Sequence, residues 1–285
     1  MDIVTKITAF FMSIIAFFCS IFGIPYYPSG EELDISKFEL TFEDDFDYLD
    51  YSVWSGHYCY GDVSTIRGGA YLNKYIPYVE DGNLIMPIKY LPDGMGGTGA
   101  GWYSSGLDTD DDVINGFSQC FGYFECRCIL PKGVDVCGAF WMMNEGVFNV
   151  DGSGKDGTEI DIFESDRYGD IRNNAITSNL HYDGYDEAHQ TMRAKKFLIR
   201  GNPYEEYNTY GVEWNEKEYI FYINRVETFR TSWGGVSQNP QYMILSNFLA
   251  GENAIPSGRE NAPGEECQMI VDYVRAYQYK DLLNN

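Results

Sequence analysis

The sequence predicts an all-β protein, built as a sandwich of antiparallel sheets. Between Ala70 and Gln278, short runs rich in Tyr, Phe, Ile and Val alternate with clusters of Gly, Asn, Asp and Pro. Runs of this kind, bounded by turn residues, are typical of strands in a sandwich. The sequence shows no internal repeat and no long amphipathic helix, and a chain of 285 residues suits one large β-domain. Strand spacing alone does not separate a jelly roll from an immunoglobulin-like sandwich.

The first 24 residues predict a leader. From Ile7 to Ile24 the chain is almost wholly apolar, and Lys6 is the lone cation before this run. The pattern fits a signal peptide or an N-terminal membrane anchor, and the sequence leaves both open. In either case we expect a secreted or cell-surface protein, with residues 7–24 as the membrane attachment if the leader is retained.

A linker and one folded domain are expected after the leader. Residues 25–33 contain two prolines and a Ser-Gly pair, which do not suit a helix or a central strand. The folded domain is then predicted over residues 34–281. Its first strand is expected at Phe38–Phe46, and Val79–Met86 is predicted to form a hairpin with Asp-Gly at the turn.

The acidic composition narrows the choice of partner. The formal net charge is −23. Nucleic-acid binding requires a basic surface, so the composition argues against it and favours an uncharged or cationic partner. We expect most of these carboxylates to provide solubility, and we expect a monomer.

One predicted strand carries three carboxylates. Glu159, Asp161 and Glu164 are separated by Ile, Ile and Phe. A strand alternates its side chains between two faces, so Glu159 and Asp161 share a face, while strict alternation would turn Glu164 away. A β-bulge at Ile162 and Phe163 would reset the alternation and direct all three carboxylates into one cleft. The sequence predicts this bulge.

Three like charges at this spacing predict an acid and a nucleophile side by side. Mutual repulsion raises the pKa of at least one carboxyl group, so that one stays protonated near neutral pH while another is ionised. A retaining glycosidase requires such a pair, with its carboxyl groups about 5 Å apart. An exposed acidic edge strand is the alternative interpretation, although Asp and Glu are disfavoured in strands.

The strand resembles the active-site strand of glycoside hydrolase family 16. That strand reads Glu-x-Asp-x-Glu or, in the laminarinase-like branch, Glu-x-Asp-x-x-Glu, and this chain has the longer form. Further stretches resemble family strands and occur in the family's order: Gly122–Gly133, Gly138–Met143, Tyr210–Trp214, Ile220–Asn224 and Val271–Tyr277. The resemblance implies a β-jelly roll of two antiparallel sheets with a concave sugar-binding cleft, and it makes residues 34–281 a glycoside hydrolase catalytic domain.

The resemblance also implies roles for the three carboxylates. Glu159 would be the nucleophile, and Glu164 the general acid and then the general base. Asp161 would be a helper that hydrogen-bonds to the nucleophile. The reaction would be a double displacement through a glycosyl-enzyme intermediate, with retention at the anomeric carbon.

Further substrate-binding residues are implied in the same way. Trp141 matches a family position that lines the cleft, although a core Trp would fit the strand as well. Trp102 and Tyr103 fall in a segment that resembles one lining the non-reducing side. His181 falls where the family places a cleft His, and a structural His is the alternative. Weaker candidates are Arg67 and Trp54.

No cofactor is expected for the chemistry. By resemblance, Asp272 on the closing strand would hold a structural calcium ion on the convex face, or else be a surface carboxylate. The remaining ligands cannot be assigned from sequence, because calcium takes oxygens from side chains, backbone and water.

The sequence does not predict that all of the cysteines form disulfides. Cys126 and Cys128 share the apolar face of a predicted strand with Phe124, so we expect two buried free thiols that act as small hydrophobes. The sequence leaves open the pairing of the others: Cys59, Cys120, Cys137 and Cys267.

Resemblance to this branch predicts an endo-acting hydrolase of a β-linked polysaccharide. The substrate that it favours most is β-1,3-glucan or mixed-linkage glucan. Hydrolases of β-galactan, agar-type polymers and mucin O-glycans share the catalytic strand and remain alternatives. A cell-wall transglycosylase and a non-catalytic glucan-binding protein are alternatives from other classes. Loops set this choice, and the insert Asn144–Asp156 is predicted to be a mobile rim of the cleft or a plain surface loop.

Overall fold

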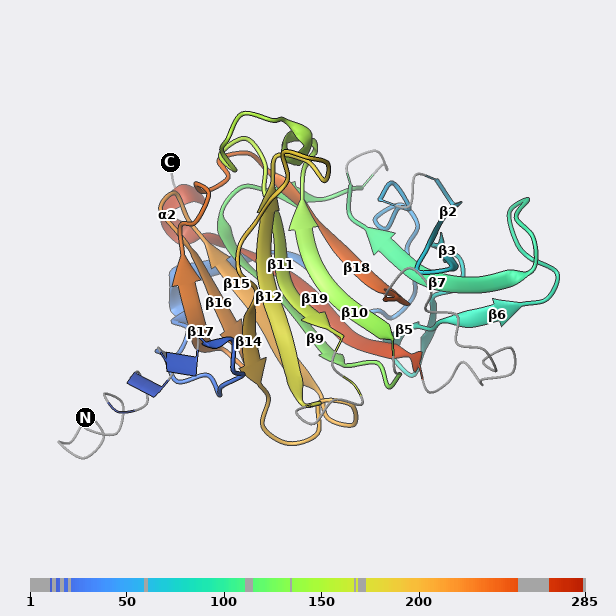
Figure 1. Cartoon of the computed structure of the whole chain (residues 1–285), viewed down its shortest axis with the longest axis horizontal. Coiled ribbons are helices and arrows are strands. Elements are labelled where there is room, and N and C mark those ends of the chain that lie inside the picture. Colours follow the sequence, from blue (N-terminus) through green and yellow to red (C-terminus); the bar gives the residue numbers. More distant parts are fainter. Residues whose placement is uncertain are drawn as a thin grey trace.

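The short apolar runs form the strands of two sheets that pack face to face (Figure 1). A computed structural model describes residues 11, 14–15, 18–19, 22–58, 61–110, 115–133, 135–166, 168, 173–250 and 267–283. The predicted all-β jelly-roll class is confirmed, with paired strands antiparallel except for β3 and β7, which pair in parallel.

Within the described ranges, one sheet has eight strands in the order β17-β16-β15-β9-β19-β5-β4, with β1 paired to β19. The bounds are β1 Phe38–Asp44, β4 Tyr78–Glu80, β5 Asn83–Met86, β9 Gly122–Ile129, β15 Asn208–Trp214, β16 Tyr219–Ile223, β17 Val226–Thr231 and β19 Met269–Tyr279.

The second sheet has eleven strands in the same ranges, in the order β13-β12-β11-β10-β18-β7-β3-β2, with β14 paired to β12, β6 to β7 and β8 to β18. The bounds are β2 Val63–Arg67, β3 Ala70–Asn73, β6 Lys89–Leu91, β7 Gly101–Asp108, β8 Ser118–Gln119, β10 Val136–Met143, β11 Glu159–Ser165, β12 Ala175–Tyr182, β13 Gln190–Thr191, β14 Lys195–Leu198 and β18 Gln241–Leu249.

The helices whose bounds the structure describes are short. They are the 3₁₀ turns η1 Ile35–Lys37 and η2 Glu145–Phe148 and the α-helix α2 Lys280–Leu283. In the described part of the chain, no helix is both long enough and apolar enough to cross a membrane. Most of the predicted leader lies outside the described residues.

Two local predictions are confirmed in the eight-stranded sheet. The first predicted strand is β1, and β4 and β5 form the predicted hairpin. Its turn residues Asp81 and Gly82 both have positive φ, 50° and 70°. Two successive residues with positive φ match the twist that a two-residue hairpin needs, and Gly reaches this conformation without strain.

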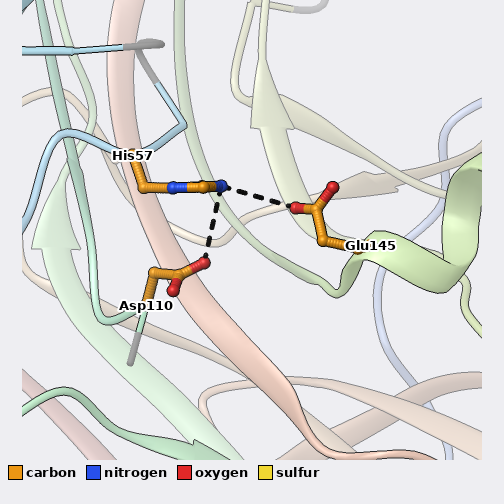
Figure 2. Close-up of side chains that lie close together, drawn as sticks. All are labelled: His57, Asp110 and Glu145. Atoms are coloured by element: carbon orange, nitrogen blue, oxygen red, sulfur yellow. Dashed lines mark ion pairs between the residues drawn. The ribbon is translucent and has the colours of Figure 1, made fainter. Parts of the chain in front are cut away.

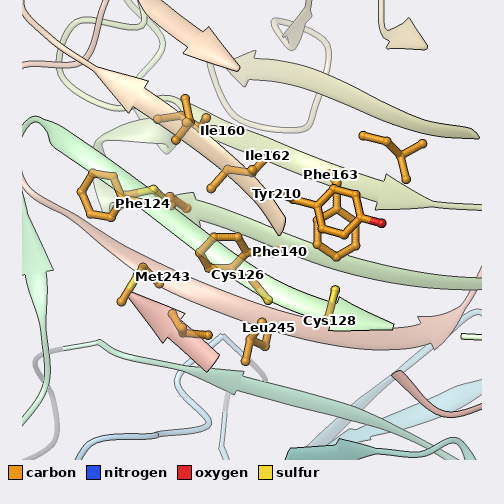
Figure 3. Packing of buried hydrophobic residues seen from close by; sticks show 14 of the residues in the cluster. Phe124, Cys126, Cys128, Phe140, Ile160, Ile162, Phe163, Tyr210, Met243 and Leu245 are labelled. Carbon is orange, nitrogen blue, oxygen red and sulfur yellow. The ribbon is translucent and has the colours of Figure 1, made fainter. Parts of the chain in front are cut away.

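The main core lies between the two sheets (Figure 3). Cys126 and Cys128 of β9 are fully buried in it and are free thiols, as predicted, and Trp214 is also fully buried there. The other described cysteines, Cys19, Cys120, Cys137 and Cys267, are free as well, and Cys59 lies outside the described residues.

The segment predicted as a linker, residues 25–33, lies against the domain. Tyr26 bridges to Phe197 of β14, and the two rings pack edge to face at 5.2 Å. Further along, Leu33 donates its backbone N–H to the carbonyl of Arg225, at 2.8 Å. The segment therefore contacts an edge of each sheet, near the N-terminal end in Figure 1.

Candidate active site

The predicted bulge is present on β11, an interior strand of the eleven-stranded sheet. Opposite β10, Phe140 pairs with Phe163 but its neighbour Trp141 pairs with Asp161, so Ile162 has no partner of its own. Opposite β12 the register also shifts between Asp161 and Glu164. One extra residue has therefore entered the strand at Ile162 and Phe163.

The bulge sorts the side chains of β11 onto two faces. Ile160, Ile162 and Phe163 all point into the main core, and two of them are consecutive (Figure 3). Glu159, Asp161 and Glu164 instead line one cleft on the other face. An exposed acidic edge strand is excluded, because β11 is paired on both sides.

The cleft has a volume of about 390 Å³, within the usual range for small-ligand sites. Besides the three carboxylates, its walls are formed mainly by aromatic and apolar side chains. The described lining residues are His57, Tyr58, Leu72, Ala139, Trp141, Met143, Glu145, Phe148, Tyr185, Tyr242 and Phe248.

Glu164 has the environment of a general acid. Burial raises the pKa of Glu164 to about 8, and the negative charges of Asp161, Asp166 and Glu159 add to the increase. At neutral pH this carboxyl group is therefore mostly protonated, and it can donate a proton.

Asp161 contacts His181, which in turn contacts His189. His181 places Nε2 3.2 Å from Oδ2 of Asp161, while its Nδ1 lies 2.8 Å from Nε2 of His189. Burial lowers the pKa of His189, and His181 lowers it further. The predicted cleft histidine, His181, thus contacts a catalytic-strand carboxylate and is not among the residues that line the cleft.

Trp141 forms part of the cleft wall, where the sequence places it. Its indole N–H donates to Oγ of Ser246 at 3.1 Å. Its ring meets Tyr58 edge to face, with the ring centroids 4.9 Å apart. These two contacts fix a flat apolar surface beside the carboxylates.

A second group of ionisable side chains, His57, Asp110 and Glu145, lies away from β11, and two of its members, His57 and Glu145, line the cleft (Figure 2). His57 Nε2 lies 3.6 Å from Glu145 and 3.8 Å from Asp110, and Tyr242 donates its hydroxyl to Glu145 at 3.3 Å. Because Glu145 belongs to the insert, this contact joins the insert to the loop that carries His57.

Two sets of described side chains bring three ligand atoms within 4.8 Å of one another, as a bound cation requires: His57 with Asp110 and Glu145, and Glu159 with Asp161 and His181. The second set joins two carboxylates of β11 to His181 of β12. Asp272, the residue expected to hold calcium, forms an ion pair with Arg127. A cation at this carboxylate would compete with the guanidinium, and the calcium site stays a prediction.

The structure does not bring Trp102 or Tyr103 to the cleft. Trp102 is buried in a small cluster with Ile88 and Leu249. Tyr103 is also buried, and its hydroxyl donates to the carbonyl of Gly99 at 2.9 Å. Their predicted roles in binding remain predictions.

Of the two weaker candidates, the structure describes the side chain of Trp54 alone, and Trp54 is not among the lining residues. Trp54 packs in the main core and donates its indole N–H to Asp44 at 2.7 Å. The side chain of Arg67 lies outside the described part of β2.

Sequence reasoning missed several cleft residues. Tyr185, whose hydroxyl donates to Oε2 of Glu159, was not singled out, although it follows an Asp-Gly turn after the strand of His181. No motif in the sequence points to His57. The predicted rim, the insert Asn144–Asp156, does supply Glu145 and Phe148 to the cleft.

The fold and the cleft together define a β-jelly-roll protein with a carboxylate-lined groove across one sheet. The family model of glycosyl hydrolases family 16 matches residues 97–274, more than half of the chain, and the chain belongs to this family.

Named relatives agree with this assignment. Endo-1,3-1,4-beta-glycanase EglC of Rhizobium meliloti is 28% identical over 86% of this chain and 53% of its own length. Beta-porphyranase B of Zobellia galactanivorans is 32% identical over 58% of this chain and 59% of its own length. The chain thus spans just over half the length of these two relatives. The laminarinase catalytic domain of Thermotoga petrophila shares the fold, with a TM-score of 0.62 at 21% identity, covering 85% of this chain and 98% of that domain.

Proposed function

We propose that the protein is a retaining, endo-acting glycoside hydrolase that cleaves β-1,3-glucan or mixed-linkage β-glucan by double displacement. One observation carries the proposal: the bulge directs Glu159, Asp161 and Glu164 into one cleft, where Glu164 is held protonated near neutral pH. Family membership supports the reaction class.

In the first step, Glu159 attacks the anomeric carbon. The bond from that carbon to the glycosidic oxygen breaks as the ester to Glu159 forms, and Glu164 transfers its proton to the departing oxygen. Asp161 lies beside both groups, and its charge helps to keep the proton on Glu164 until the sugar binds.

In the second step, the roles reverse. Glu164, now ionised, takes a proton from a water molecule, and the oxygen of that water attacks the anomeric carbon as the bond to Glu159 breaks. Two inversions at one carbon give net retention. Trp141 supplies an apolar platform for a sugar face at this point of the cleft.

The lining favours an uncharged glycan. Among the described residues that line the cleft, none is Lys or Arg, while four are Asp or Glu. A sulfated galactan such as porphyran would bring anionic groups toward these carboxylates, with no described cation to pair them. The name of EglC, an endo-1,3-1,4-β-glycanase, is consistent with a neutral β-glucan.

The location and assembly of the protein are part of the same proposal. A polysaccharide too large to enter a cell calls for an enzyme outside the cytoplasm, and the apolar run of residues 7–24 is suited to export or attachment. We propose that the enzyme acts as a monomer.

The test is release of reducing ends from laminarin, mixed-linkage glucan, agarose, porphyran and mucin O-glycans. Wild-type protein is compared with Glu159→Ala and with Glu80→Gln, a matched acidic control on the exposed end of β4 in the other sheet. We expect cleavage of laminarin or mixed-linkage glucan by wild type and control, and none by Glu159→Ala.

Other outcomes would replace parts of the proposal. Cleavage of porphyran, agarose or mucin glycan alone would keep the hydrolase and change its substrate. Binding to a glucan without cleavage would identify a binding protein. Transfer products that dominate with excess acceptor would identify a transglycosylase. Proton NMR of the first-formed sugar anomer tests retention independently.

A further inference from the structure

Tyr185 lies against the proposed nucleophile. It follows β12, and its hydroxyl group donates a hydrogen bond to Oε2 of Glu159. Its ring lines the cleft and is 47% exposed, so a bound sugar can reach it. Of the two carboxylate oxygens of Glu159, Oε2 is the one that accepts this hydrogen bond.

The turn that carries Tyr185 is tied to the insert Asn144–Asp156. Asp183 and Gly184 both have positive φ, 61° and 70°, which sharply redirects the chain after β12. The buried carboxylate of Asp183 accepts the backbone N–H groups of residues 151 and 152, at 3.2 and 3.1 Å. Gly184 donates its N–H to the carbonyl of Val147 at 2.7 Å.

Ring packing fixes the side chain from two further directions. Phe148 of the insert meets the ring of Tyr185 edge to face, with ring centroids 5.7 Å apart. The ring centroid of His189 lies 5.6 Å from that of Tyr185, and His189 contacts His181, which in turn contacts Asp161. The insert anchors this arrangement, because Val147 is fully buried in the cluster that contains Trp141.

The phenol of Tyr185 stays a donor at any pH at which the enzyme works. Burial raises the pKa of Tyr185, and the charges of Glu159 and Asp161 raise it further. The group therefore keeps its proton and cannot act as a general base. Its effect on Glu159 is that of a fixed hydrogen-bond donor.

We propose that Tyr185 is a positioning residue that acts in the second half of the reaction, where its hydrogen bond stabilises the carboxylate of Glu159 as it leaves the sugar. The inference rests on the proposed function and adds to it the reason why the insert is built into the cleft.

The two half-reactions respond differently to this hydrogen bond. When Glu159 attacks, it changes from an anion to a neutral ester, so a donor on the anion gives no help to this step. When water displaces the ester, the bond from the anomeric carbon to Glu159 breaks and the electron pair returns to the carboxylate. A hydrogen bond to the returning negative charge is stronger than one to the ester, so it speeds this step.

The experiment uses an aryl glycoside with a good leaving group, 2,4-dinitrophenyl β-laminaribioside, and the variants Tyr185→Phe and Tyr90→Phe. Tyr90 is an exposed tyrosine on β6 that does not line the cleft. With this substrate the first step is fast, so kcat reports the second step and kcat/KM reports the first.

For Tyr185→Phe we expect kcat to fall about tenfold, the effect of one hydrogen bond to a charged group. We expect KM to fall by a similar factor, so that kcat/KM is nearly unchanged, and a burst of one dinitrophenol for each enzyme molecule to precede the slow phase. Tyr90→Phe should match the wild type in all three measurements, and both variants should keep its melting temperature.

Two results would overturn the inference while leaving the proposed function intact. One is an equal fall of kcat and kcat/KM without a burst, which would place the role of Tyr185 in the first step or in folding. The other is no change at all. A wild-type protein that cleaves neither the glycoside nor any glucan would defeat the proposed function itself, and the inference with it.

Discussion

Replacing Glu164 with Gln is expected to abolish activity and yet to stabilise the protein above neutral pH. The pKa of Glu164 is about 8 in the folded protein against an ordinary value of 4.5. Between these two pH values the folded protein keeps a proton that the unfolded chain has already released. The free energy of unfolding therefore falls as the pH rises through this window, and Gln removes that loss.

The pKa difference sets the size of the effect. Each pKa unit corresponds to about 1.4 kcal/mol, so the full difference amounts to about 5 kcal/mol. Part of this difference is repulsion from Glu159, Asp161 and Asp166, and a neutral Gln side chain feels none of it. We therefore expect Glu164→Gln to raise the free energy of unfolding by up to about 5 kcal/mol at pH 9, and by little at pH 4.

Urea unfolding of wild type and Glu164→Gln at pH 4 and pH 9 measures this difference. Other titrating groups are common to both proteins, so their contributions cancel. Glu80→Gln, at the exposed end of β4, controls for the loss of a surface charge. The reasoning is refuted if the gain in stability of Glu164→Gln is the same at both pH values.

Three further predictions concern activity and folding. The kcat/KM of wild type on polysaccharide should fall above about pH 8, as Glu164 loses its proton, and a pH–rate profile that stays level to pH 10 would exclude this residue as the acid. Trp141→Ala should raise KM about tenfold or more, because it removes the apolar platform in the cleft wall. Trp141→Phe is the control, since it keeps an aromatic ring and loses only the hydrogen bond to Ser246. A KM for Trp141→Ala equal to that of wild type would show that Trp141 does not bind substrate. A chain that begins at residue 34 should have a melting temperature about 5 °C below that of a chain that begins at residue 25, because the contacts of Tyr26 and Leu33 are lost. Equal melting temperatures by calorimetry would show that this segment adds no stability.

The carboxylate strand was predictable because its pattern is local. The side-chain period of a strand is two, so the spacing of Glu159, Asp161 and Glu164 forces an extra residue if all three are to share a face. The same arithmetic placed Cys126 and Cys128 in the core. In both cases the sequence period and the burial of one face are enough to decide the result.

The loop residues of the cleft were not predictable in this way. Tyr185 reaches Glu159 because Asp183 and Gly184 turn the chain and bind it to the insert. His57 reaches Glu145 across segments far apart in the sequence. Neither contact leaves a periodic signal, since loop paths are set by backbone hydrogen bonds that form only in the folded state.

Burial also separated candidates that looked equal in sequence. Trp102 and Trp141 are both tryptophans on strands of the same sheet. Trp141 borders open space in the cleft, whereas Trp102 is covered by Ile88 and Leu249. What covers a strand face depends on its neighbours in three dimensions, and a strand's own sequence does not specify it.

The sequence by itself determined the all-β class, the bulged strand with its three carboxylates, and the family that this strand resembles, because each depends on spacing within a few residues. Only the tertiary structure decided which aromatic rings border the cleft and that His181 contacts Asp161. It also decided that the insert Asn144–Asp156 positions the hydroxyl group of Tyr185 to donate a hydrogen bond to Glu159. Those outcomes depend on contacts between distant segments, and such contacts exist only once the two sheets have packed.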